Sequence, residues 1–152
     1  MDIDDRIQSL NLVLPPPPKP AGAYRPAVLC AGIAYLSGQL SRLVDGSVMT
    51  GRVGLDLTAE RGAEAARSAA LNALSVIRHD IGWARFDRIL RITGYIQTAP
   101  GFTEIPRVLN GASELFLEVF GDAGIHARSA VGVQDLPMNS AVLLEVTLRI
   151  RE

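Results

Sequence analysis

The carboxyl-terminal part of the chain, residues 126–151, reads HARSAVGVQDLPMNSAVLLEVTLRIR and carries the pattern that decides the fold. Apolar residues alternate with other types over 141–151, which predicts a strand with one face in a core and one face left open. The stretch 128–134 predicts a second strand, and Leu136-Pro137 separates the two. We therefore expect two strands that pair antiparallel through this turn.

The two predicted strands each place one charged residue on the less apolar face. Val131 and Val133 are expected to face the core, which places Arg128 on the other face of the strand. The small residues Ala130 and Gly132 share that face and leave room for a planar ligand. Glu145 lies opposite the apolar row of its own strand. Antiparallel pairing would bring Arg128 and Glu145 together. They could form a ligand site or a cross-strand salt bridge, and the spacing leaves both open.

The preceding chain adds three strands, a helix, a strand and a helix. The expected ranges are strands over 27–31, 33–40 and near Val48, a helix from Thr58 to Gly82, a strand over 87–98 with Leu90 and Ile92 on its buried face, and a helix over 103–120. This order predicts an α+β fold, a mixed sheet with both helices on one face. The uncovered face is available to solvent or to a partner subunit in a symmetric assembly.

The length, composition and net charge of the chain limit the kinds of protein it can be. The chain has 152 residues, 48% of them hydrophobic, which suits one globular domain, and we expect an N-terminal arm over 1–22 and a domain over 23–152. A net charge of -1 argues against a nucleic-acid partner bound by phosphate neutralisation. The sequence shows neither a secretory signal nor an apolar run long enough to span a membrane, so we expect a cytoplasmic protein with no membrane partner.

Common catalytic and cofactor patterns are missing from the sequence. Its one cysteine, Cys30, cannot form a CxxC motif, and His79 and His126 do not supply the usual set of metal ligands. The sequence contains no GxSxG nucleophile motif and no phosphate-binding glycine loop. We therefore expect no metal and no organic cofactor. Residue patterns alone lead to a small α+β oligomer with a candidate anion site.

Several short motifs identify a family. They are Leu14-Pro15, Tyr24, Leu36-Ser37-Gly38-Gln39, Asn110-Gly111-Ala112-Ser113, the stretch 126–133, Leu136-Pro137 and Glu145-Val146. In this order they resemble the RidA family of reactive intermediate deaminases, also called YjgF-like or endoribonuclease L-PSP proteins. The resemblance runs from about Leu12 to the end of the chain. The proline-containing arm is most similar to a divergent branch of that family.

The resemblance implies a chorismate-mutase-like fold of the bacillus type, assembled as a homotrimer with an inner barrel of sheets and three pockets between subunits. In the family, the arginine matching Arg128 holds a substrate carboxylate, and the glutamate matching Glu145 positions the hydrolytic water. Other pocket residues match Tyr24, Ser37, Gly38 and Asn110, and Ala130 takes the place of the usual cysteine. The implied substrates are 2-imino acids and their enamine tautomers, which become 2-keto acids and ammonia without a cofactor.

The expected function is therefore hydrolytic deamination of a small carboxylate-bearing imine or enamine. The alternative is a trimer without catalysis that binds small carboxylates or a protein partner. A ribonuclease is the least favoured, because the net charge is slightly negative and neither histidine has an obvious acid-base partner. The chain also has about two more residues between Pro137 and Glu145 than typical deaminases, so Glu145 needs a bulge to keep its register.

Overall fold

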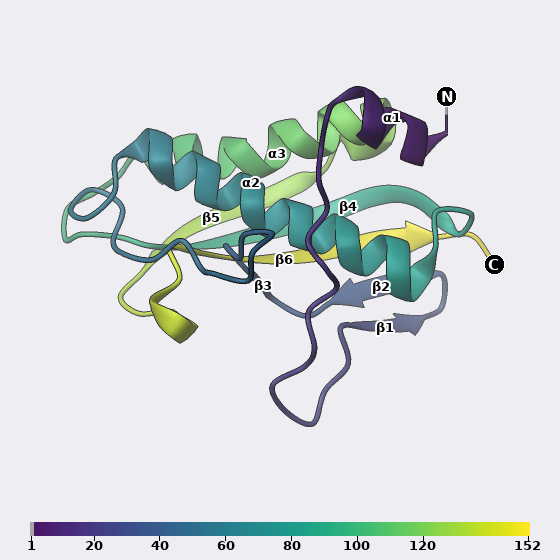
Figure 1. The fold of residues 1–152 in the computed structure, drawn as a ribbon, viewed down its shortest axis with the longest axis horizontal. Helices are drawn as coiled ribbons and strands as arrows, with labels where there is room; N and C mark the ends of the chain where they lie inside the picture. The colour runs from purple at the N-terminus through teal and green to yellow at the C-terminus, as the bar shows by residue number, and fades with distance from the viewer. Residues whose placement is uncertain (1) are drawn as a thin grey trace.

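The computed structural model describes residues 2–152 as a twisted mixed sheet with two long helices lying on one face (Figure 1). This arrangement confirms the α+β class, with a mixed sheet and both long helices on one face, whereas the strand expected over 33–40 is divided into two. The helices are α1 (Ile3–Ser9), α2 (Ala59–Val76) and α3 (Ile105–Phe120), and the strands are β1 (Ala27–Cys30), β2 (Ile33–Leu36), β3 (Gln39–Leu40), β4 (Phe86–Gln97), β5 (Ala127–Val133) and β6 (Val142–Ile150).

Helix α2 begins at its predicted cap, and helix α3 ends at its predicted glycine. The Thr58 hydroxyl accepts a hydrogen bond from the Arg61 amide at 3.1 Å, which satisfies one free donor at the start of α2. A π-helical turn over Ile77–Ile81 extends α2 to Gly82. Pro106 is tolerated in the first turn of α3, and Gly121 follows its last residue. No helix in the described part of the chain has the length and apolar character needed to cross a membrane.

The sheet runs in the order β1-β2-β6-β4-β5, with β3 also paired to β6. The predicted antiparallel pairing of β5 with β6 is therefore wrong, because β4 lies between them. β4 and β5 are parallel, and α3 forms the crossover that joins them. This long connection, rather than the short turn after β5, decides which strand β5 joins.

The faces of β5 are the reverse of those predicted. Arg128 pairs in register with the buried Ile92, so it points to the helix-covered side, whereas Val131 is 43% exposed on the other side. β5 is an edge strand beneath α3, where space is short: a Cβ on Gly132 would meet Ile105 at 3.0 Å. Small residues therefore belong under the helix, and the valines fall on the open face.

Two smaller expectations are also corrected. A register shift in β4 between Ile89 and Arg91 places Ile89, not Leu90, in the core with Ile92. The strand expected near Val48 is reduced to a single bridge with Arg42. Both changes are local, because a bulge alters the alternation of side chains within one strand.

The face of the sheet opposite the helices carries exposed apolar side chains. Tyr35 pairs with Thr147 in β6 and with Val28 in β1, which places these residues on the same face as Glu145. Val28 and Tyr35 are 56% and 53% exposed. This open face matches the uncovered face that the sequence predicts, and an apolar surface of this kind is typical of an interaction site.

The two long helices approach each other closely because small residues line their contact. Six of the twelve buried residues of α2 are alanine, and Gly111 of α3 packs directly on the backbone of Ala63. A Cβ at position 111 would overlap the Ala63 carbonyl oxygen. Gly94 in β4 similarly leaves the space that Leu109 fills. Together these residues hold α3 against both α2 and the sheet.

We predict that Gly111→Ala destabilises the protein by about 1–3 kcal/mol, because the new methyl group forces the helices apart. The free energy of unfolding in urea measures the effect. Glu114→Ala, an exposed position of the same helix, is the matched control and should stay within about 0.5 kcal/mol of wild type. Equal stabilities for the two variants would mean that the contact at Gly111 is not tight.

Candidate functional site

A cleft of about 380 Å³ lies between the N-terminal arm and the strands β3 and β6. Four of the predicted site residues line it: Tyr24, Ser37, Gly38 and Glu145. They come from three separate parts of the chain, namely the loop before β1, the break between β2 and β3, and the middle of β6. The structure therefore brings these four predicted residues together at one surface.

A β-bulge shapes the floor of the cleft. Pairing with β6 stops at Tyr35, opposite Thr147, and resumes at Gln39, opposite Leu144. Three residues on one side of this interval, 36–38, therefore face two on the other, Glu145 and Val146. Gly38 leaves the space that the Leu143 side chain fills, because a Cβ at position 38 would meet that side chain at 2.6 Å. The bulge thus places Ser37 and Gly38 beside Glu145.

The other wall of the cleft is tied to this bulge by hydrogen bonds. The Ser37 hydroxyl donates to the Arg25 carbonyl at 2.7 Å, and the Ser37 amide donates to the Pro26 carbonyl at 2.9 Å. The Tyr24 hydroxyl accepts from the Ala21 amide at 3.2 Å. These contacts hold the segment before β1 against the sheet, so Tyr24 lies over the cleft.

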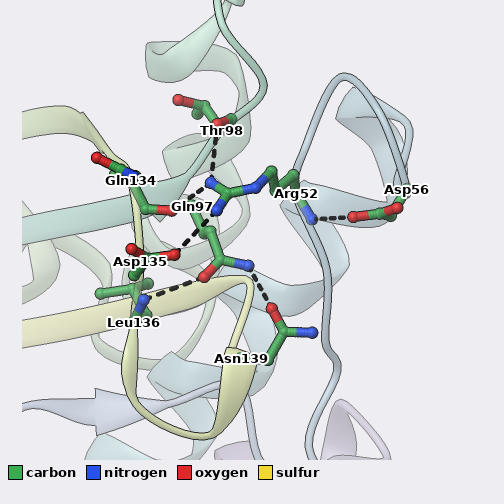
Figure 2. A network of polar contacts seen from close by, with 8 residues as sticks. All are labelled: Arg52, Asp56, Gln97, Thr98, Gln134, Asp135, Leu136 and Asn139. Atoms are coloured by element: carbon green, nitrogen blue, oxygen red, sulfur yellow. Dashed lines mark hydrogen bonds and ion pairs between the residues drawn. The ribbon is translucent and has the colours of Figure 1, made fainter.

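The turn between β5 and β6 contributes a third wall and is anchored by the side chains of Gln97 and Arg52 (Figure 2). Gln97, which is 2% exposed, accepts a hydrogen bond from the Leu136 amide at 3.0 Å and donates to the Asn139 side chain at 2.7 Å. Arg52 forms an ion pair with Asp135 at 2.9 Å. These anchors fix the turn whose residues Pro137 and Met138 line the cleft.

The turn before β6 lies in the interval where the resemblance predicts two more residues than in typical deaminases. Met138 and Asn139 both adopt left-handed backbone conformations, with φ of 56° and 54°. β6 then alternates without interruption from Val142 to Ile150, so no bulge in β6 is needed. Because side chains alternate with a period of two, an insertion of two residues leaves Glu145 on the same face. The Glu145 side chain is exposed and forms no hydrogen bond or ion pair with any other residue in 2–152.

Arg128 lies on the other side of the sheet, away from this cleft. Its guanidinium donates to the Ser113 hydroxyl at 3.0 Å and to the Pro106 carbonyl at 3.3 Å, both in α3. Asn110 lies on the same stripe of α3, between these two residues, and Ala130 follows on the same face of β5. Within this chain, the predicted residues therefore form two groups, and Arg128 and Glu145 do not form the cross-strand salt bridge that the sequence left open.

A short hydrogen-bond relay positions Arg128. A guanidinium can only donate, so the Ser113 oxygen accepts from Arg128 and its proton is directed to His126 Nε2, at 3.0 Å. His126 Nδ1 then carries the ring proton and donates to the Gly124 carbonyl at 2.6 Å. Burial lowers the pKa of His126, and the nearby positive charge of Arg128 lowers it further, against the opposing effect of the Gly124 carbonyl. The neutral ring is thus the form that fits the relay.

We predict that this relay weakens on acidification. Because the pKa of His126 is lower in the folded protein than in the unfolded chain, the unfolded chain takes up the proton more readily. The stabilisation is present above the unfolded pKa of about 6.5 and is lost as the pH falls toward the folded value. Urea unfolding at pH 7.5 and 5.5 should show a larger loss for wild type than for His126→Gln. His79→Gln, an exposed histidine, is the control and should behave as wild type.

Several cleft residues were not predicted from the sequence. They are Lys19 and its neighbouring prolines, Arg42, Asn72 and Met138. Lys19 and Arg42 lie 23 positions apart in the sequence, and no local pattern joins them. The unbroken run of prolines before Lys19 is the one available signal, because it indicates a stiff segment that must lie somewhere on the surface.

Comparison with known proteins gives concordant matches. A family model described as YjgF/chorismate mutase-like, putative endoribonuclease matches residues 4–149. Protein TCP17 of Trypanosoma cruzi is 38% identical over 147 residues, covering 95% of this chain and 91% of that protein. The 2-iminobutanoate/2-iminopropanoate deaminase of Dermatophagoides farinae is 28% identical over 129 residues, covering 84% of this chain and 86% of the relative. A solved structure from Shewanella oneidensis MR-1, named as a putative endoribonuclease, has a TM-score of 0.94 at 31% identity, covering 98% of this chain and 99% of that chain.

Proposed function

This chain belongs to the YjgF/RidA-like family, and on that premise we propose that it is a hydrolytic deaminase of small carboxylate-bearing imines and enamines. The family includes imine deaminases, of which the Dermatophagoides farinae relative is one by name. The observation that carries the proposal is the cleft that gathers Tyr24, Ser37, Gly38 and Glu145. These are four of the pocket residues that the family resemblance implies.

The proposed active site is completed by a neighbouring subunit. Arg128 and Asn110 lie on the helix side at the β5 edge, and Glu145 lies on the open face, so one chain does not join them. In a homotrimer whose open faces meet, the β5 edge of one subunit would border the cleft of the next. The exposed apolar side chains of Val28, Tyr35 and Val131 support such an interface, because it would remove them from water.

The residue types suit the chemistry of imine hydrolysis. The guanidinium of Arg128 would bind the substrate carboxylate through two charge-assisted hydrogen bonds and thereby fix the adjacent C=N carbon. The carboxylate of Glu145 would take a proton from a water molecule as the water oxygen bonds to that carbon. The resulting carbinolamine then breaks its C–N bond, with the proton passing to nitrogen, and releases ammonia and a 2-keto acid. Water is the only co-reactant.

The assembly is tested by mass. A chain of 16.3 kDa should form a closed trimer of about 49 kDa, three times the chain mass. Light scattering or analytical ultracentrifugation at micromolar concentration measures this directly. Tyr35→Glu, which places charge on the open face, should lower the mass toward that of the monomer. A stable wild-type monomer would contradict the shared site.

The catalytic assignment is tested on 2-iminobutanoate generated in situ. Glu145→Gln should reduce turnover by about 10²- to 10⁴-fold, because the amide keeps the shape but cannot act as a base. Glu64→Gln, on the surface of α2, is the control and should keep wild-type turnover. Arg128→Lys should weaken binding of the 2-keto acid product, since an ammonium lacks the two-pronged geometry. Product binding without measurable wild-type turnover would instead favour a trimer that only binds carboxylates.

A further inference from the structure

The cleft holds two positively charged side chains that the deaminase mechanism does not use. Arg42 and Lys19 both line it, together with Glu145. Both belong to the same subunit as Glu145, so they are separate from the carboxylate-binding role proposed for Arg128. We infer that Arg42 and Lys19 form a second anion-binding subsite, which makes the preferred substrate a dianionic imino acid with a second acidic group on its side chain. This inference rests on the proposed function and specifies its substrate class.

Arg42 is held in place without a negatively charged partner. Its guanidinium donates to the Gly46 carbonyl at 3.0 Å and contacts the Met138 sulfur at 3.6 Å. Its backbone carbonyl accepts from Ser68 and Asn72 of α2, each at 2.7 Å. Among residues 2–152, no carboxylate lies within 4.0 Å of this guanidinium. A half-buried, oriented and uncompensated guanidinium favours an anionic ligand.

Lys19 reaches the cleft from the proline arm. Proline fixes φ at each of its positions, so the run from Pro15 to Pro18 gives the arm a stiff backbone. The proline run is docked at its first residue. Pro15 is buried, and its carbonyl accepts a hydrogen bond from the Ser75 hydroxyl. Figure 1 shows the arm passing over α2 before it reaches the loop that precedes β1. The only lysine of the chain is therefore presented at the cleft by a restrained backbone, which reduces the entropy lost on binding.

The charge balance of the cleft favours two anionic groups on the ligand. Of its lining residues, Glu145 is the single acid, against the two cations Arg42 and Lys19. With Arg128 supplied by the neighbouring subunit, three cations would surround one carboxylate. A monocarboxylate would leave Arg42 and Lys19 without a partner. A side-chain carboxylate or phosphonate would engage both through charge-assisted hydrogen bonds.

The experiment compares the binding of 2-oxoglutarate with that of 2-oxobutanoate to the full-length protein by calorimetry. The wild type should bind the dianion at least about tenfold more tightly, as expected for one charged hydrogen-bonded pair. Arg42→Met should reduce this ratio by about tenfold, and Lys19→Met by a few-fold, because Lys19 is exposed to solvent. Lys19→Arg should retain the ratio. Binding of 3-phosphonopyruvate separates a preference for phosphonate from one for carboxylate.

Arg25→Met is the matched control, because it removes one positive charge from the exposed segment before β1 without altering the lining of the cleft. It should keep the wild-type ratio, and thermal unfolding checks that each variant folds. Equal wild-type affinities for the two keto acids would overturn the inference. So would a ratio in Arg42→Met that equals the wild-type ratio, or a ratio lowered as much by Arg25→Met.

Turnover separates this inference from the proposed function. Imines formed in situ by an amino-acid oxidase from 2-aminobutanoate and from glutamate are the two substrates. Hydrolysis of both imines with equal efficiency and no dianion preference would support the deaminase and overturn the second subsite. A dianion preference that depends on Arg42, without hydrolysis of either imine, would support the subsite and contradict the deaminase.

Discussion

The close packing of α3 against α2 and the sheet is the constraint on which the rest of the structure depends. Gly111 lies on the Ala63 backbone, so the two helices meet at backbone distance, and Gly94 lets the Leu109 side chain pack directly on the sheet. Because α3 is also the crossover between β4 and β5, this packing places β5 parallel to β4 at the edge of the sheet. Both long helices then cover the same face, and the other face stays open.

The separation of the candidate site into two groups follows from that topology. Adjacent residues of a strand point to opposite faces, so Arg128, level with Ile92, lies under α3, and Glu145, level with Thr93, lies on the open face. The edge position of β5 exposes Arg128 at a margin of the subunit. The proposed site needs both residues, and it would therefore require a second copy of the chain.

Within the cleft, irregular backbone does the positioning. The bulge at 36–38 places Ser37 and Gly38 beside Glu145, and the left-handed residues Met138 and Asn139 carry the turn that forms another wall. Regular strands would leave a flat surface here. Gln97 and the ion pair of Arg52 with Asp135 hold the turn in place, so the shape of the cleft is built in before any ligand binds.

The sequence by itself determined the two long helices, the long strands and the open sheet face. Alternation over 142–150, the alanine-rich face of α2 and the cap at Thr58 are local patterns, and local patterns predict local structure. Only the tertiary structure decided that β4 separates β5 from β6, that Arg128 faces α3, and that Lys19 and Arg42 share the cleft with Glu145. These facts depend on contacts between distant segments. An edge strand such as β5, half-exposed on both faces, has no strong alternation from which its orientation could be predicted.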